Sequence, residues 1–173
     1  MMHAMPDSLH APWRMEYIRS LEKSPADGEC FLCLASAADE GQRRERLVLW
    51  TSEHCVVCLN KYPYTNGHLL IAPKAHTPEM EGLSDDEAID MQRQTLKAVK
   101  VLKRAMSPQG FNIGINLGRC AGAGLPGHLH QHVVPRWAGD TNFISVVGEV
   151  RIIPQAMGQL YEELVRAAVD VAQ

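Results

Sequence analysis

The chain has 173 residues, enough for one domain with a substantial core, and its hydrophobic and charged fractions of 46% and 21% are ordinary for a globular protein. A net charge of −3 provides no general attraction for nucleic acid or for an anionic membrane, and no apolar run approaches the roughly 20 residues of a membrane span. The composition therefore argues against both partners. An anionic substrate would have to be held locally by histidines, backbone N–H groups or a metal ion.

The N-terminal residues carry no sign of export. Residues 1–10 have no apolar signal-peptide core and are expected to form a short disordered leader before a single domain of residues 11–173. The chain has five cysteines, an odd number, so we expect a cytoplasmic protein whose cysteines are ligands or core residues and not disulfides. Between the first two pairs of cysteines, the polar residues 35–46 predict an exposed loop.

Short apolar or alternating segments bounded by Gly, Pro or Asn predict five strands. They cover residues 47–50, 55–59, 68–72, 111–116 and 128–134. Pro63 and the turn pair Asn66-Gly67 separate the second segment from the third, which favours a hairpin-like connection between those two strands.

Two helices are predicted from periodicity and end signals. Ser84 and Glu87 form a capping box, apolar residues then recur at helical spacing to about residue 106, and Pro108 and Gly110 end the helix. A second apolar stripe predicts a helix over residues 155–171. The order of elements predicts an α+β domain with an antiparallel sheet of about five strands, one long helix and a C-terminal helix.

Three histidines alternate along the last predicted strand, at His128, His130 and His132. Alternate side chains of a strand share a face, and at a rise of ~3.3 Å per residue the outer two lie about 13 Å apart, too far for one metal ion to bind all three. A chance polar face is the alternative. However, each buried imidazole needs a hydrogen-bond partner, which makes such a row costly as mere packing. We therefore interpret the row as an active site.

A glycine-rich segment leads directly into this row. Its glycines are Gly114, Gly118, Gly122, Gly124 and Gly127. Glycine lets backbone approach a ligand closely and leaves N–H groups free for phosphate oxygens. Such a segment alone is usually an ordinary loop, but its continuity with the histidines favours phosphate binding.

The sequence HLHQHVV at residues 128–134 resembles the motif of the histidine-triad (HIT) family, in which histidines alternate with apolar residues. The segment GHLLIAPKAH at residues 67–76 is similar to the family's Gly-His strand that ends in Pro-x-x-His, and Leu59-Asn60 is similar to its apolar-Asn step. Residues 11–18, 135–137 and 139–143 resemble the bacterial branch near diadenosine tetraphosphate phosphorylases. The resemblance spans residues 11 to 154, with a C-terminal extension expected from residue 138 onwards.

This resemblance implies a homodimer whose sheets join across the interface. It also implies an enzyme, a nucleotidyl hydrolase or transferase that cleaves dinucleoside polyphosphates such as diadenosine tetraphosphate at the α-phosphate, without an organic cofactor. Water is the acceptor in a hydrolase and inorganic phosphate in a phosphorylase. A nucleoside phosphoramidase and a non-catalytic nucleotide-binding protein are the alternatives, although a binding protein has no need of a positioned nucleophile.

Roles for the triad follow from the same resemblance. It implies that His130 is the nucleophile of a nucleotidyl-histidine intermediate, that His132 contacts the bridging or α-phosphate oxygen, and that His128 is an orienting member. The negative charge that develops needs hydrogen-bond donors, which His132 as imidazolium and the N–H groups of the glycine-rich loop could supply. Gln131 stands where the family pattern has an apolar residue. Because Gln131 should face away from the histidines, we expect no loss of chemistry.

The resemblance also implies a set of substrate-binding residues. Asn60 corresponds to a ribose-binding Asn, His68 to a histidine close to the phosphate, and Asn116 to a polar phosphate contact. Gly124 stands where many members have a Gln or Ser that touches phosphate. We therefore expect only backbone N–H groups, from Gly124 and Leu125, at that position.

The cysteine pairs suggest two metal hypotheses. In HIT relatives with an N-terminal Cys-x-x-Cys, a structural zinc is bound by residues corresponding to Cys30, Cys33, His76 and His128. A four-cysteine zinc ribbon that adds Cys55 and Cys58 is the other hypothesis. We reject it because residues three apart in a strand face opposite sides of the sheet, so this second pair is expected in the core.

Overall fold

The computed structural model describes residues 30–141 and 153–171, so the expected leader and residues 11–18 lie outside the described part. The described strands form one five-stranded antiparallel sheet in the order β1-β2-β3-β5-β4. The strands are β1 (Val48–Thr51), β2 (Cys55–Leu59), β3 (Leu69–Pro73), β4 (Gly110–Ile115) and β5 (Gln131–Arg136). The predicted α+β class and antiparallel sheet of about five strands are confirmed.

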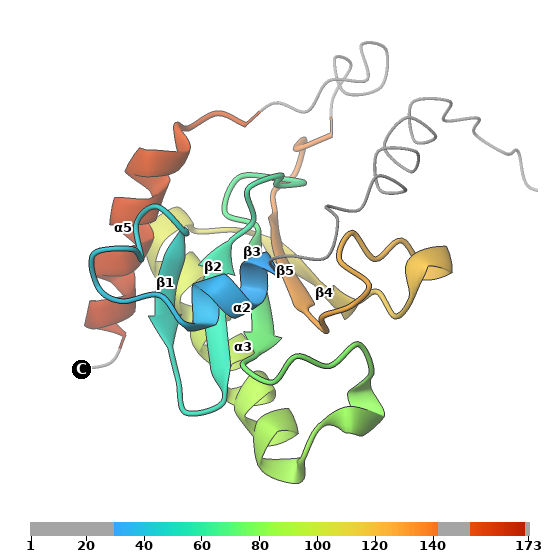
Figure 1. Ribbon diagram of the computed structural model, residues 1–173. Coiled ribbons are helices and arrows are strands. Elements are labelled where there is room, and N and C mark those ends of the chain that lie inside the picture. Colours follow the sequence, from blue (N-terminus) through green and yellow to red (C-terminus); the bar gives the residue numbers. More distant parts are fainter. Residues whose placement is uncertain (1–29, 142–152, 172–173) are drawn as a thin grey trace, which may run out of the picture.

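Helices cover the two faces of this sheet unequally (Figure 1). The long helix α3 (Asp85–Met106) and the helix α5 (Met157–Asp170) pack on one face, over a core cluster that includes Val57, Ile71 and Val133. The short helix α2 (Phe31–Ser36) lies on the other face, over a smaller cluster. Two short 3-10 turns, η1 (Met80–Gly82) and η2 (Arg119–Ala121), interrupt the connecting loops.

The long helix begins and ends where its sequence signals predict. The Ser84 hydroxyl accepts a hydrogen bond from the Glu87 backbone N–H, and the Glu87 carboxylate accepts one from the Ser84 backbone N–H, which completes the capping box. At the other end, Ser107 adopts a left-handed conformation with φ 49°, and Pro108 follows it. The predicted start and end of this helix are confirmed.

The C-terminal helix is attached to the outer strand of the sheet. The Tyr161 hydroxyl donates a hydrogen bond of 2.9 Å to the carbonyl of Val48, and Leu164 is fully buried in the larger core cluster. The observed helix, Met157–Asp170, is shorter at both ends than the predicted residues 155–171. No helix in the described residues is long and apolar enough to cross a membrane.

The β2–β3 hairpin is confirmed, with a register that runs from Cys55 opposite Pro73 to Leu59 opposite Leu69. Gly67 in its loop has φ +79°, and a Cβ there would lie 2.7 Å from the Met106 sulfur. Both the backbone conformation and the contact with α3 therefore require glycine. At Gly67, next to His68, the loop therefore packs closely against the C-terminal end of the long helix.

Candidate active site and metal centre

The last strand begins later than predicted. β5 starts at Gln131, so His128 and His130 precede the strand and only His132 lies within it. The backbone N–H of His128 bonds to the Leu125 carbonyl and that of Leu129 to the Thr77 carbonyl, so these groups contact loops and not neighbouring strands. The predicted strand boundary is wrong at its N-terminal end, because loop contacts replace the sheet hydrogen bonds there.

The separation of the two faces is nevertheless as predicted. Gln131 donates a hydrogen bond of 2.9 Å from its side-chain amide to the Thr95 hydroxyl of α3, and Leu129 and Val133 belong to the core under that helix. Gln131 therefore faces away from the histidines. The rings of His130 and His132 lie on the other side, with centroids 5.0 Å apart.

His130 is held by the main chain. Its Nδ1 lies 2.8 Å from the carbonyl oxygen of His128, and the side chain is only 5% exposed. A carbonyl only accepts hydrogen bonds, so Nδ1 carries the proton and Nε2 keeps its lone pair. Burial lowers the pKa of His130 below its ordinary value, which favours the neutral ring. A neutral imidazole with a free Nε2 lone pair is a nucleophile.

His132 receives its orientation through His68. The backbone N–H of Tyr64 donates to His68 Nδ1 over 3.1 Å, so the His68 proton lies on Nε2. That Nε2 is 2.9 Å from His132 Nδ1 and donates to it. The proton of neutral His132 therefore lies on Nε2, which makes this atom a hydrogen-bond donor on a ring that neighbours His130.

The charge expected for His132 is corrected by its surroundings. Burial, followed by the nearby His130, lowers the pKa of His132 to about 4. The ring is then neutral at physiological pH in the free protein and not an imidazolium. It can still donate a hydrogen bond to a phosphate oxygen, because its proton already lies on Nε2.

This low pKa makes stability depend on pH. Between the ordinary pKa of 6.5 and about 4, the unfolded chain binds a proton at His132 and the folded chain does not, so the free energy of unfolding falls as pH decreases through this window. Because the side chain is partly exposed, we expect a contribution on the order of 1–2 kcal/mol. Urea denaturation near neutral pH and at about pH 5 should show that the free energy of unfolding falls less between these two pH values in His132→Asn than in the parent. An equal loss in both proteins would contradict the assignment.

The predicted substrate residues lie at two sides of the triad. The Asn60 amide nitrogen is 3.3 Å from His68 Nδ1, and the Asn116 amide nitrogen is 3.5 Å from His132 Nε2. Gly124 is exposed in the loop that precedes His128, whereas Leu125 is partly buried against the smaller core cluster. The structure brings Asn60, His68 and Asn116 next to the triad. The two loop residues lie in the segment that leads into it.

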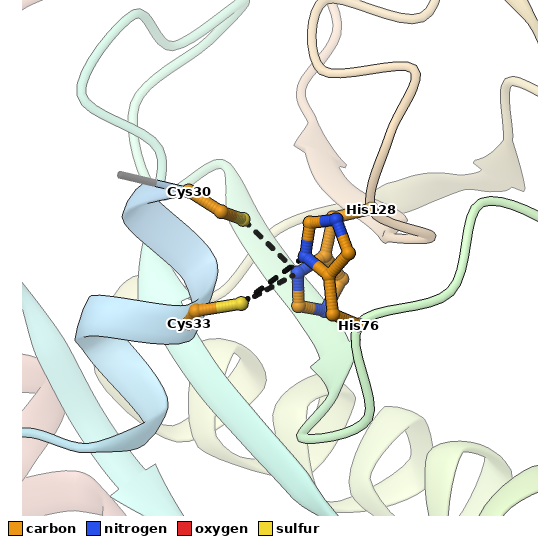
Figure 2. A group of neighbouring side chains, drawn as sticks. All are labelled: Cys30, Cys33, His76 and His128. Carbon is orange, nitrogen blue, oxygen red and sulfur yellow. Dashed lines mark hydrogen bonds between the residues drawn. The ribbon is translucent and has the colours of Figure 1, made fainter. Parts of the chain in front are cut away.

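The four predicted metal ligands come together at the start of α2 (Figure 2). The possible ligand atoms of Cys30, Cys33, His76 and His128 all lie within 4.8 Å of one another. Cys30 Sγ is 3.1 Å from His128 Nδ1, and Cys33 Sγ is 3.2 Å from His76 Nδ1. A tetrahedral zinc with ordinary bond lengths places sulfur and nitrogen ligands ~3.5 Å apart. The residues present therefore fit a zinc ion.

His128 is oriented for such a role. Its Nε2 lies 2.8 Å from the carbonyl oxygen of Pro73, so Nε2 carries the proton and Nδ1, which faces the thiols, is free to bind a metal. The backbone carbonyl of His128 also holds His130. One residue thus connects the metal cluster to the candidate nucleophile.

The other cysteines lie elsewhere. Cys55 belongs to the core cluster beneath α3 and Cys58 to the cluster beneath α2, as the alternation of a strand predicts. Burial raises the pKa of each thiol to about 12. Cys120 is exposed in η2. The structure therefore supports the rejection of the four-cysteine ribbon.

Sequence reasoning missed two parts of the site. It placed no helix at Phe31–Ser36, although this helix carries Cys33. Six residues are too few for a periodic signal, so the only cue was the Cys-x-x-Cys spacing itself. It also missed the backbone groups of Tyr64 and Pro73, because any residue type supplies a carbonyl and nearly all supply an N–H.

The fold and site together define a histidine-triad protein, an α+β domain in which three alternating histidines lie before and within the inner strand β5. The HIT domain family model matches residues 42–139 of this chain. The chain belongs to the HIT family.

Similar proteins are known in several organisms. A Mycobacterium tuberculosis protein named AP-4-A phosphorylase is 39% identical over 155 residues, which cover 86% of this chain and 77% of that protein. A bis(5'-nucleosyl)-tetraphosphatase (asymmetrical) of Schizosaccharomyces pombe is 30% identical over 93 residues, or 56% of this chain and 50% of that protein. The crystal structure of a Zn-bound histidine triad family protein from Mycobacterium smegmatis matches with a TM-score of 0.65 and 25% identity, covering 84% of this chain and 98% of that one.

Proposed function

We propose that this HIT-family enzyme cleaves dinucleoside polyphosphates, such as diadenosine tetraphosphate, at the α-phosphate through a nucleotidyl-His130 intermediate. The observation that carries the proposal is the hydrogen bond of 2.8 Å between His130 Nδ1 and the His128 carbonyl, which leaves Nε2 as a nucleophile. The relatives named as a phosphorylase and as a tetraphosphatase support this class of substrate.

In the first step, His130 Nε2 attacks the α-phosphorus. A P–N bond forms while the bond from phosphorus to the bridging oxygen breaks, and the polyphosphate leaves with that electron pair. The ring of His130 gains positive charge, which its Nδ1–H shares with the His128 carbonyl. The leaving oxygen gains negative charge and accepts a hydrogen bond from His132 Nε2–H.

In the second step, an acceptor attacks the same phosphorus and the P–N bond breaks, which returns His130 to its neutral form. If inorganic phosphate is the acceptor, diadenosine tetraphosphate yields ADP and ATP. If water is the acceptor, its proton passes to solvent and the products are AMP and ATP. The 39% identity with the phosphorylase favours phosphate as the acceptor.

The nucleoside joined to the attacked phosphate is expected near Asn60. This amide lies beside His68, on the loop between β2 and β3, and amide groups are suited to bind ribose hydroxyls. The backbone N–H groups of Gly124 and Leu125 and the amide of Asn116 are proposed as donors to phosphate oxygens. The substrate would then extend across the triad between these two groups of residues.

The direct test is incubation of the purified protein with diadenosine tetraphosphate, with and without inorganic phosphate, followed by chromatographic separation of the products. ADP and ATP formed only with phosphate would establish a phosphorylase, and AMP and ATP formed without it a hydrolase. Cleavage of a nucleoside phosphoramidate alone would overturn the proposed substrate. Binding of diadenosine tetraphosphate without any cleavage would overturn the proposed catalysis.

We also infer that Cys30, Cys33, His76 and His128 hold a structural zinc ion. The set of two thiols and two imidazoles closes a tetrahedral site and leaves no open position for substrate. The neighbouring Zn-bound structure from Mycobacterium smegmatis supports zinc in this family. The proposed role of the metal is to hold α2, the loop after β3 and His128 in place.

A homodimer remains a prediction. β4 lies at one edge of the sheet, and its Ile113 side chain is 47% exposed, so a second copy that pairs along this strand would cover apolar surface. Sedimentation analysis should give twice the mass of one chain. A single-chain mass at micromolar concentration would contradict this expectation.

Replacement of Gln131 should leave catalysis unchanged. In Gln131→Leu the Thr95 hydroxyl still donates its 2.8 Å hydrogen bond to the Met91 carbonyl, so this buried hydroxyl keeps a hydrogen-bond partner. We expect the free energy of unfolding to change by less than about 1 kcal/mol and kcat by less than about twofold. A large fall in kcat with unchanged stability would mean that Gln131 acts in the reaction.

A further inference from the structure

A pocket of about 480 Å³ lies between two loop segments, one that follows β3 and one that leads into the triad. Its two walls are the segment that contains η1, with Pro78, Glu79 and Glu81, and the glycine-rich loop, with Leu117, Gly118 and Pro126. Both segments extend from the same end of the sheet, where β3 ends and β5 begins (Figure 1). A volume of this size lies within the range of about 300–1,000 Å³ that is typical for small-molecule sites.

Each wall continues along the chain from a residue that contacts the triad segment. The Leu129 N–H donates a hydrogen bond of 2.6 Å to the Thr77 carbonyl, so Pro78 follows a residue that is bonded to the triad segment. On the other side, Leu117 follows Asn116, whose amide nitrogen lies 3.5 Å from His132 Nε2. The residues that precede both walls therefore lie next to the triad, which puts the pocket within reach of a chain of phosphates that extends past His132.

Internal contacts hold each wall in shape. In the η1 segment, the Thr77 hydroxyl bonds to the Glu79 carbonyl, and a Cβ at Gly82 would lie only 2.5 Å from the Thr77 hydroxyl oxygen. In the glycine-rich loop, Gly118 has φ +76° and its carbonyl accepts a hydrogen bond from the Ala123 N–H. Each wall of the pocket thus contains a turn that is closed by its own hydrogen bond.

The chemistry of the lining suits a nucleoside better than a phosphate chain. Pro78, Pro126 and Leu117 supply apolar surface against which a flat base can pack. Glu79 and Glu81 are exposed carboxylates, and neither forms an ion pair within the described residues. Carboxylates accept hydrogen bonds from ribose hydroxyls, whereas they repel phosphate oxygens.

We propose that this pocket binds the distal nucleoside of a dinucleoside polyphosphate, the one that departs with the leaving group. The inference rests on the proposed function, because it assumes that such a substrate spans the triad. Base and ribose would lie between the prolines and Leu117, with the ribose hydroxyls donating to Glu79 or Glu81. The site would then distinguish dinucleoside polyphosphates from nucleotides that end in a bare phosphate.

The test compares two substrates that differ only at that end, diadenosine tetraphosphate and adenosine 5'-tetraphosphate. In the double variant Glu79→Gln, Glu81→Gln we expect KM for diadenosine tetraphosphate to rise about tenfold, the effect of losing one charge-assisted hydrogen bond, with kcat nearly unchanged. KM for adenosine 5'-tetraphosphate should stay the same. The matched control Glu45→Gln, Glu53→Gln removes two exposed carboxylates outside the pocket lining and should change neither value.

Two outcomes would overturn the inference. If KM changed equally for both substrates, the two carboxylates would contact the phosphate chain, through a divalent cation, and not the distal nucleoside. If KM changed for neither substrate, the two carboxylates would take no part in substrate recognition. Titration of the full chain with adenosine, followed by NMR, is a second readout that needs no catalysis. Backbone amide shifts are expected at residues 79–82 and 117–118. Their absence would overturn the pocket assignment even if the enzyme cleaves neither substrate, whereas their presence without cleavage would contradict only the proposed function.

Discussion

His130→Ala is expected to reduce kcat for diadenosine tetraphosphate by at least about 10⁴-fold, because the variant lacks the atom that forms the covalent bond to phosphorus. Binding should change much less, since the predicted ribose and phosphate contacts come from other residues. Steady-state kinetics would give kcat and KM. Mass spectrometry of the parent after rapid quenching should detect one adenylyl group on the chain, which the variant cannot carry at this position.

The matched control for this change is His54→Ala. His54 is a surface histidine whose Nε2 lies 3.9 Å from the Glu53 carboxylate, and it lies outside both the triad and the metal cluster. The control should retain full activity. If His130→Ala kept substantial activity while its unfolding curve matched that of the parent, covalent catalysis by His130 would be refuted.

Cys33→Ser is expected to lower the zinc content from one ion per chain to nearly none. A ligand present at a thousand times its Kd stabilises the folded state by about 4 kcal/mol, so loss of the ion should lower the free energy of unfolding by an amount of that order. Inductively coupled plasma mass spectrometry and urea denaturation would measure the two effects. Activity should also fall, because His128 joins the cluster to His130.

Cys120→Ser provides the comparison, since Cys120 is exposed and belongs to no cluster of possible metal ligands among the described residues. It should retain zinc, stability and activity. If the parent protein contained no zinc after expression in zinc-replete medium, the proposed zinc site would be refuted. Equal zinc in Cys33→Ser and the parent would place the ion elsewhere.

Much of the fold was predictable because its signals are local. The Ser84 capping box and Pro108 mark the ends of α3, and the alternation of strand residues correctly separates Gln131 from the histidines. Periodicity cannot detect α2, which has only six residues. The start of β5 was misjudged because Leu129 bonds to Thr77, a contact that depends on tertiary structure and has no local pattern.

The grouping of the candidate site residues was predictable from the sequence, but their protonation was not. The triad, Asn60, His68 and the four possible zinc ligands all lie where their motifs imply. The charge of His132 was not predictable, because it depends on burial and on a chain of donors that begins at the Tyr64 backbone. A sequence states which titratable groups exist, whereas their pKa values belong to the folded environment.

The partner of His130 Nδ1 is a main-chain carbonyl, and this has a consequence for how the protein can vary. A side-chain partner can be exchanged by a point mutation, and the basicity of the nucleophile would change with it. A carbonyl is present whatever residue occupies position 128, so no single codon change removes it. Evolution or directed evolution of this centre would therefore act through the path of the backbone and the depth of burial, and insertions or deletions in the preceding loop should matter more than substitutions.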